Sequence, residues 1–505
     1  MKKNLFMVAA VALMAMVSCN KEEVNQSGPE VAPEPSYYVE FTAQIDNEET
    51  PAPAQTPAQT QTRTAYDKTN NTTKWIDGDL ISVNGKRFKI KELAADGLSA
   101  TFINDEELGE DFDAPFTAIY PYNATEGSAV VPSTQTVTDG TFADESVVTV
   151  AYSAENNTLS FKHVTSVVKF QVATEGVSEL TFSSSVALAG TISVNANEGG
   201  EPTYEATAGS KTITVKPESG TFSVGETYYV SVLPTVGEAE TKVDFAIKCE
   251  GVTVKSGNVN FKRNVMMNAK EIEVKYVYMK PSLVWNIASP RYAVYYYGEG
   301  EGNHTWTDMS DTDGDGVYRT VVPEGSYTTL IYCRMNPGNA TNDWKYKWNQ
   351  TSDLDIPTGS SNAYIIKPLT WDNGVGTWNT LSEAKSYKEN TVYLKPSTDW
   401  KSDNAWFAIC LCNGSKGVEW RKLSQLDDTF YGVELPADFS YANYNNILFV
   451  RMDPDKTALD WASKWNQTGD LSTTQLTTYG NYCCKIPTQN DWNVGTNVTW
   501  SKKLN

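Results

Sequence analysis

The chain has 505 residues and carries 62 acidic against 41 basic side chains, for a formal net charge of −21. This charge argues against a nucleic-acid partner, because phosphate binding needs clustered Lys and Arg. Only two histidines are present, so His-rich metal sites and most His-based catalysis are not expected. We predict neither a metal nor a cofactor.

The amino terminus has the features of an export signal. Lys2 and Lys3 precede an apolar run, residues 5–17, that is too short to span a bilayer. The segment Met16–Cys19 resembles a bacterial lipobox, which implies a signal peptide over 1–19 and lipidation of Cys19. The acidic run within 20–23 resembles the surface-export signal of Bacteroidetes lipoproteins; a solvated charge run without a signal is the alternative. We expect a lipid anchor in the outer membrane and a protein that faces the cell exterior; a chance Cys after an ordinary signal peptide is the alternative.

Short strands and polar turns follow. Residues 20–35 are rich in Glu and Pro and predict a flexible tether, and the Pro-rich stretch 46–62 predicts a linker. From residue 36 onward apolar and polar residues alternate over short stretches without long helical periodicity, which predicts an all-β fold. We place two β-sandwich subdomains at 36–175 and 176–274.

Several segments of this half resemble the fimbrillin-like (Mfa-like) family of Bacteroidetes. They are the strand 38–44, the triplet 62–64, the turn 75–79, and His163 followed by the strand 167–170. The resemblance implies paired β-sandwich subdomains and a relation to pilus subunits and their accessory proteins. It also implies that Arg63 is a candidate cleavage site, where trimming would free a groove for a neighbour's strand, although an Arg in a linker is exposed without any such role.

Structural roles are the simpler expectation within these motifs. Trp75 is predicted to be core, and Asp77–Asp79 a tight turn in which Gly supplies a positive φ. His163 has no neighbouring His, so we do not expect it to bind a metal or act as a base.

The carboxy-terminal half contains an internal repeat. Tyr278–Ser282 recurs as Tyr393–Ser397, 115 residues later, and Trp344–Thr351 recurs as Trp461–Thr468. Two units of this size, rich in alternating strands, predict two small β-sandwiches in tandem. We place them at 275–388 (module 1) and 389–505 (module 2).

The aromatic residues of module 1 suggest a carbohydrate site, because Trp and Tyr stack on the apolar face of sugar rings. Side chains alternate along the strand 292–297, and a sandwich buries one face of each sheet. We therefore predict that Tyr292 and Tyr296 are core and that Tyr295, Tyr297 and the following Trp306 form an exposed platform. That all of these rings are core is the alternative.

Both modules resemble the family 26 starch-binding modules, over roughly 276–380 and 391–502, which implies immunoglobulin-like β-sandwiches. The shared features are the Lys-Pro strand, the Y-x-Y strand with a Trp after it, and the R-M-N-P and W-N-Q-T segments. In that family a Y-x-Y pair and a following Trp contact α-1,4-linked glucose. The resemblance carries this role to Tyr295, Tyr297 and Trp306.

Module 2 departs from this pattern. Cys410 and Cys412 stand at the positions of the two tyrosines, while Trp420 remains near the position of the Trp. The module is then a weakened site, or it uses Trp406 and Trp420 differently. A structural disulfide from Cys410 or Cys412 to Cys483 or Cys484 is a further alternative.

Two further segments support more than one interpretation. In 344–350, the tryptophans at helical spacing predict core packing, whereas Asn349 and Gln350 are candidates for contact with sugar hydroxyls. The Asp-rich loop 311–316 is predicted to be a hairpin turn and not a calcium site, because the twelfth position of an EF-hand loop is here Val322.

These patterns predict a non-catalytic cell-surface lipoprotein that binds a starch-like α-glucan through its C-terminal modules. A structural fimbrial subunit or tip adhesin is the alternative, and other glycan-uptake or fimbrial proteins are candidate partners. No region resembles a catalytic domain, so we expect no enzyme activity.

Overall fold

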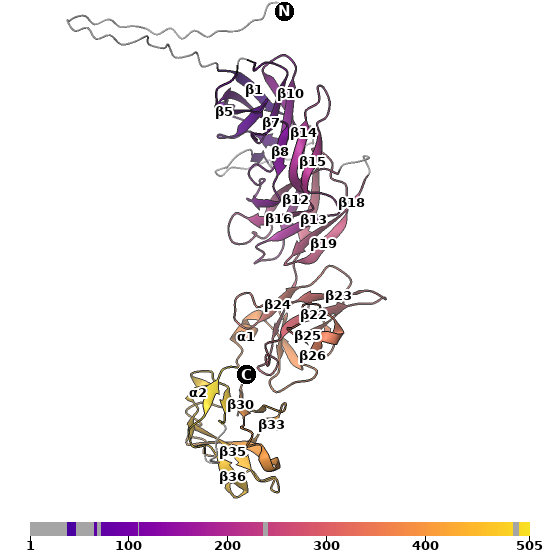
Figure 1. The fold of residues 1–505 in the computed structure, drawn as a ribbon. Coiled ribbons are helices and arrows are strands. Elements are labelled where there is room, and N and C mark those ends of the chain that lie inside the picture. The colour runs from indigo at the N-terminus through magenta and orange to yellow at the C-terminus, as the bar shows by residue number, and fades with distance from the viewer. Residues whose placement is uncertain are drawn as a thin grey trace, which may run out of the picture.

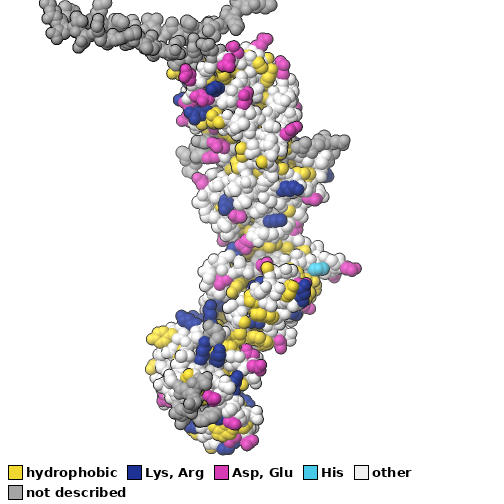
Figure 2. All heavy atoms as spheres, in the orientation of Figure 1, with side chains coloured by type: hydrophobic (Ala, Val, Ile, Leu, Met, Phe, Trp, Pro, Cys, Tyr) yellow, Lys and Arg dark blue, Asp and Glu magenta, His cyan; other side chains and the backbone are white. Residues whose placement is uncertain are grey.

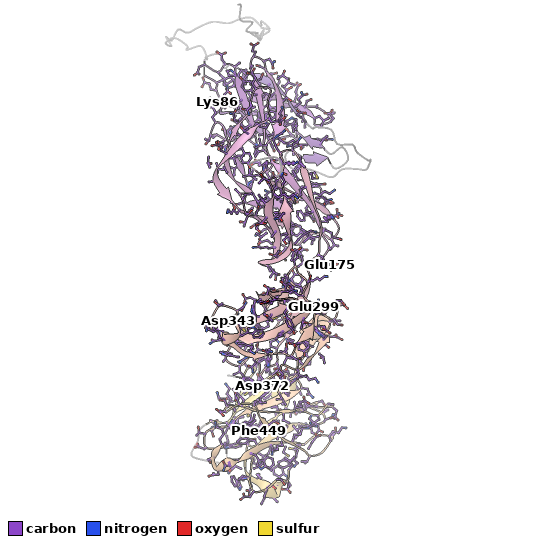
Figure 3. All side chains as sticks on the ribbon, turned by 90° about the vertical axis from the view of Figure 1, so that its right-hand side faces the viewer. Lys86, Glu175, Glu299, Asp343, Asp372 and Phe449 are labelled. Carbon is purple, nitrogen blue, oxygen red and sulfur yellow. The ribbon has the colours of Figure 1, made fainter. Side chains whose placement is uncertain are left out.

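The computed structural model describes residues 38–46, 65–67, 72–109, 111–235, 241–487 and 494–504; Cys19 and Arg63 lie outside them. Four β-rich units follow one another along a long axis, from the amino-terminal unit to the C-terminal module (Figure 1). Figure 3 shows the same order from the side, with Lys86 in the first unit and Phe449 in the last. The all-β class is confirmed: within the described ranges the α-helices are only α1 (Leu381–Ser386) and α2 (Thr474–Thr477). In that part of the chain no helix has the length and apolarity to span a bilayer.

The first unit is a sheet that closes on itself, in the order β1-β11-β10-β7-β4-β5-β6. Strand β1 closes it, pairing parallel with β11 and antiparallel with β6. Trp75 lies in the core with its ring against Phe102, Tyr120 and Phe161, as predicted. The strands are β1 (Glu40–Ile45), β4 (Leu80–Val83), β5 (Lys86–Leu93), β6 (Ser99–Asn104), β7 (Phe116–Tyr120), β10 (Thr149–Ser153) and β11 (Thr158–His163), beside the hairpin β2 (Ala65–Asp67) and β3 (Thr72–Lys74).

The second unit takes strands from both sides of the predicted boundary at 176. Its sheets are β17-β12-β20, β19-β18-β13-β16-β9 and β15-β14-β8. The boundary therefore falls at no single point of the chain, because β8, β9 and β12 all precede residue 176. The strands are β8 (Ser128–Val131), β9 (Thr134–Val137), β12 (Ser166–Val172), β13 (Leu180–Ser184), β14 (Ala189–Asn195), β15 (Thr203–Ser210), β16 (Thr212–Pro217), β17 (Thr227–Val232), β18 (Val243–Cys249), β19 (Val252–Val259) and β20 (Met266–Ile272).

Module 1 is a sandwich of two sheets, β24-β21-β28-β29 and β23-β22-β25-β26, and β27 also pairs with β25. Its core contains Trp285, Tyr292, Tyr296 and Tyr332. The strands are β21 (Tyr276–Lys280), β22 (Arg291–Tyr297), β23 (His304–Asp308), β24 (Tyr318–Val321), β25 (Thr329–Met335), β26 (Lys347–Gln350), β27 (Leu354–Asp355), β28 (Ala363–Ile366) and β29 (Gly376–Asn379).

Module 2 repeats this topology, with sheets β33-β34-β30-β38-β39 and β32-β31-β35-β36, and β37 also pairs with β35. The sequence repeat is thus a repeat of structure. The strands are β30 (Thr391–Lys395), β31 (Trp406–Cys412), β32 (Glu419–Lys422), β33 (Ser424–Gln425), β34 (Tyr431–Glu434), β35 (Asn446–Met452), β36 (Lys464–Gln467), β37 (Leu471–Ser472), β38 (Cys483–Lys485) and β39 (Thr499–Ser501).

The two modules share an apolar cluster at their junction. Val284 of module 1 packs there with Tyr393, Phe430 and Cys483 of module 2. The backbone N–H of Leu283 also donates to the carboxylate of Glu389 across the junction. The outer side of the β30/β38 sheet therefore lies against one end of module 1, and the other sheet of module 2 lies on the far side.

This arrangement rules out the predicted disulfide between these strands of module 2. Cys410 and Cys412 lie on the outer side of the far sheet, whereas Cys483 faces module 1 and Cys484 lies in the core between the sheets. All four thiols are free.

Candidate functional site

Strand β22 carries the predicted tyrosines, and its side chains alternate as expected. Tyr292 and Tyr296 are 1% and 0% exposed, in the core, while Tyr295 and Tyr297 are half-buried on the outer side of the sheet. The register with β23 sets Trp306 directly opposite Tyr295. The two ring centroids are 4.9 Å apart, and the rings of Tyr295 and Tyr297 are 5.8 Å apart.

A further ring that the sequence did not assign completes this cluster. Trp344 lies 4.8 Å from Tyr295 and 4.9 Å from Trp306, between ring centroids. We call Tyr295, Tyr297, Trp306 and Trp344 the lateral face. Figure 2 shows apolar side chains gathered on the third unit, where Figure 1 labels β22, β25 and β26.

The predicted core packing of Trp344 and Trp348 is wrong, since they are 41% and 39% exposed. The segment is not an α-helix. A 3-10 turn, Trp344–Tyr346, is capped by Asp343, whose side chain accepts from the Lys345 N–H. Strand β26 then begins, with a bulge against β25. The i, i+4 spacing therefore places the two rings on different surfaces.

Polar side chains border the lateral face. The Lys347 ammonium lies 5.2 Å from the centroid of the Trp344 ring and donates to Gln350. Gln350 stands opposite Cys333, which lies in the floor beneath the rings. At another edge Arg291 and Asp308 form an ion pair of 3.1 Å. Burial, followed by Asp353, raises the pKa of Tyr297.

Asn349, the other amide predicted to contact sugar, points inward. It is 7% exposed, accepts from Arg334 Nη1 at 3.2 Å and donates to the Trp371 carbonyl at 3.1 Å. The Arg334 guanidinium lies 4.5 Å from the Trp348 ring centroid and 5.0 Å from that of Trp371. These residues build an internal support for module 1 and are separate from the lateral face.

Module 2 carries a related surface. Trp420 and Trp461 pack at 4.6 Å and 72°, much as Trp306 and Trp344 pack at 4.9 Å and 64°. Trp406 lies on the same outer side of the sheet, over a floor that includes Cys410. We call Trp406, Trp420 and Trp461 the distal face. The sequence prediction of Trp420 found one member of the Trp pair and missed its partner.

The two faces point in different directions. Module 2 meets module 1 through the sheet opposite to its distal face, so the distal face lies at the free end of the molecule (Figure 1). Module 1 contributes residues 283–287 and 369–371 to the junction, which follow β21 and β28 at one end of its sandwich. Its sheets therefore face sideways from the long axis, and so does the lateral face.

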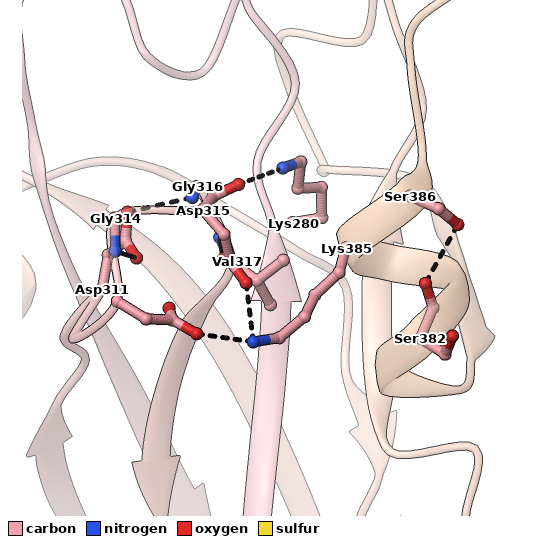
Figure 4. Close-up of polar contacts among 10 residues, drawn as sticks. Lys280, Asp311, Gly314, Asp315, Gly316, Val317, Ser382, Lys385 and Ser386 are labelled. Carbon is pink, nitrogen blue, oxygen red and sulfur yellow. Dashed lines mark hydrogen bonds and ion pairs between the residues drawn. The ribbon is translucent and has the colours of Figure 1, made fainter.

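The Asp-rich loop is closed by an ion pair. The carboxylate oxygens of Asp311, Asp313 and Asp315 lie within 4.8 Å of one another. Lys385 of α1 reaches Asp313 at 2.5 Å and Asp315 at 2.8 Å (Figure 4). Asp311 accepts from the backbone N–H groups of residues 314 and 316. The loop connects β23 and β24, which belong to different sheets, so the predicted hairpin turn is not formed; Lys385 instead ties the loop to α1.

His163 is buried beside the second unit. Its Nε2 lies 3.4 Å from Thr73 Oγ1, and its carbonyl accepts from Arg263 Nη1 at 2.8 Å. Burial and then the charge of Arg263 lower the pKa of His163 to about 4. This is the environment of a neutral structural histidine.

No protein-family model matches the chain, and no curated protein matches it. A solved structure of a candidate cell adhesion protein from Bacteroides uniformis is similar at 16% identity and a TM-score of 0.27, over 42% of this chain and 93% of its own. A fimbrial protein from Bacteroides ovatus is similar at 12% identity and a TM-score of 0.21, over 58% of this chain and 55% of its own. Likenesses this weak add no argument to the geometry.

Proposed function

We propose that the protein is a cell-surface adhesion protein that binds polysaccharide through its C-terminal modules. The observation that carries this proposal is the lateral face, where Tyr295, Trp306 and Trp344 contact one another on the outer side of a sheet. Partly exposed aromatic rings are stabilised when an apolar surface covers them. The C–H face of a sugar ring is such a surface.

The border of the lateral face supports the same function. Lys347 and Gln350 offer an ammonium and an amide next to the rings, and sugar hydroxyls both donate and accept. Pockets for small ligands combine an apolar wall with a few polar groups in this way. The resemblance to family 26 modules makes a neutral α-1,4-glucan the ligand class to test first.

The test is affinity electrophoresis of the full chain in gels that contain starch, with maltoheptaose in titration calorimetry. At about 1 kcal/mol for each stacked ring, Trp306→Ala is expected to weaken binding about fivefold. The triple variant Y295A/W306A/W344A is expected to lose more than a hundredfold. Tyr479→Ala removes a 57% exposed ring elsewhere on module 2 and serves as the control. If starch does not retard the wild type, or if the triple variant binds as the wild type does, the lateral face is not the site.

A structural fimbrial role is the second candidate, and the position of β1 favours it. This strand closes the first unit between β11 and β6 and buries Phe41, Ala43 and Ile45. Cleavage after Arg63 would separate β1 from the rest of the chain. Its release would leave two strand edges that a neighbour's strand could pair with.

This candidate is tested by an Arg-specific protease followed by electrophoresis in heated detergent. A fimbrial subunit should form a ladder of oligomers after cleavage, and Arg63→Ala should remain monomeric. Only monomers after complete cleavage at Arg63 would speak against assembly of this kind.

A further inference from the structure

The distal face repeats the Trp pair of the lateral face but changes the residues around it. The strand registers pair Trp406 with the position of Arg291 and Lys422 with that of Asp308. Module 2 therefore has a Trp and a Lys where module 1 has an ion pair.

This exchange changes the local charge. In module 1 the guanidinium of Arg291 is neutralised by Asp308 at 3.1 Å. In module 2 the Lys422 ammonium lies 4.8 Å from the centroid of the Trp406 ring. Lys464 lies 5.4 Å from that of Trp461 and donates to Gln467 at 2.8 Å, as Lys347 does to Gln350 beside Trp344 in module 1. The cation that module 2 adds is therefore Lys422. Within the part of the chain that the structure describes, neither Lys422 nor Lys464 has a carboxylate in ion-pair range.

Acidic residues also border the distal face. Asp460 caps the turn that begins at Trp461, and the Trp406 indole N–H donates to the carbonyl of Asp453. Asp470 accepts from the side chains of Asn413 and Asn446, at 3.2 and 3.1 Å. It also raises the pKa of Cys412, after the larger effect of burial. Since Cys412 and Trp406 are the two ends of β31, Asp470 lies at the end of the strand opposite to Trp406.

The replacement of two tyrosines by cysteines also opens the middle of the surface. Cys410 and Cys412 are buried in a floor with Ala408, Leu448 and Val450. Trp420 stands opposite Cys410, four residues along β31 from Trp406. At about 3.3 Å per residue, the two stacking points are roughly 13 Å apart along the strand. A ligand that uses both must contain more than one sugar ring.

We propose that the distal face binds a polyuronate, a polysaccharide whose sugars carry carboxylates. Sugar rings stack on Trp406 and on the Trp420–Trp461 pair, and Lys422 and Lys464 receive the carboxylates. The charge complementarity of the two ammonium groups selects this occupant over a neutral glucan. The proposal extends the proposed carbohydrate binding to a second site with a different ligand.

The experiment measures binding of the full chain to polygalacturonate and to its fully methyl-esterified form, by calorimetry at low and high salt. Binding to the acidic polymer is expected to be at least tenfold tighter than to the ester and to weaken as NaCl rises. The double variant K422Q/K464Q should lose at least tenfold, and W420A/W461A should abolish binding. The control Lys211→Gln, an exposed lysine of the second unit, should leave it unchanged.

The outcomes separate this proposal from the first one. Equal affinity for the acid and the ester, or no effect of the Lys422 and Lys464 changes, overturns the polyuronate assignment. Loss of polygalacturonate binding in W306A/W344A, with W420A/W461A unaffected, overturns the location. Starch binding depends on Trp306 and Trp344 and is measured in parallel, so failure of either site is visible while the other is intact. Circular dichroism of each variant confirms that a loss of binding is not a loss of fold.

Discussion

Arg334 supports module 1 from inside, and its replacement by Met should be costly. The side chain is 3% exposed; Nε donates to the Trp285 carbonyl at 2.7 Å, and Nη2 donates to the carbonyl of Ile287. The guanidinium also lies between the rings of Trp348 and Trp371. Burial lowers the pKa of Arg334 from its ordinary value, yet the group stays charged at neutral pH.

The magnitude follows from the groups that lose their partner. Each buried acceptor left unpaired costs about 1–3 kcal/mol. The Ile287 carbonyl and Asn349 Oδ1 lose their donor, whereas the Trp285 carbonyl keeps the Tyr292 hydroxyl at 3.0 Å. Two cation–π contacts add about 0.5–1 kcal/mol each. The Met stem refills part of the volume, so Arg334→Met should lower the free energy of unfolding of module 1 by about 3–5 kcal/mol, the range seen when one partner of a buried charge network is removed.

Native-state hydrogen exchange with mass spectrometry resolves the units of the full chain and is the appropriate assay. Amides of β22 and β25 should lose 3–5 kcal/mol of protection, while those of the first unit keep theirs. Arg334→Lys should fail to rescue, because an ammonium cannot reach both carbonyls as the planar fork does. Lys347→Met, at the border of the lateral face, is the control and should change protection by less than about 0.5 kcal/mol. A loss below about 1 kcal/mol in Arg334→Met would refute this account of the support.

Three further predictions concern other buried groups. Burial lowers the pKa of His163 from 6.5 to about 4, so as the pH falls the unfolded chain takes up the proton before the folded chain does. The contribution of His163 to the free energy of unfolding should be complete above about pH 6.5 and fall by about 3 kcal/mol toward pH 4. Urea titrations at several pH values should show this slope in the wild type and not in His163→Gln. Glu389→Ala leaves the Leu283 N–H and the Tyr393 hydroxyl without their acceptor, so proteolysis between the modules should speed up at least tenfold against wild type. Burial raises the pKa of every described thiol, so a thiol reagent at pH 8 should react only after denaturation with Cys249, Cys333, Cys410, Cys412, Cys483 and Cys484.

The sequence predicted features that depend on local period and missed those that depend on packing between segments. Alternation along β22 separates the core ring of Tyr296 from the surface ring of Tyr295, because successive side chains of a strand point to opposite sides. The internal repeat likewise predicted two sandwiches of one topology. By contrast, the position of Trp344 depends on a 3-10 turn that brings it onto rings from β22 and β23, and spacing alone suggested a helix.

The sequence did not show, for the same reason, that the early strands β8 and β9 belong to the second unit. Strands β8 and β9 alternate like their neighbours, and nothing local states that their partners are β14 and β16, more than fifty residues further on. Likewise, the sequences of β31 and β38 do not show which side of each strand faces outward, and this becomes known only from the packing of the two sheets.

The shared cluster at the junction of the modules has a consequence for binding strength. Tandem modules on a flexible linker gain avidity, because the first contact raises the effective concentration of the second site for the same polymer. Here Val284, Tyr393 and Phe430 pack the modules together without such a linker, with one face at the side and the other at the end. A straight polysaccharide chain bound to one face does not pass over the other face, so this gain in avidity is absent. When both faces are occupied, the protein instead cross-links two separate polysaccharide chains that run in different directions.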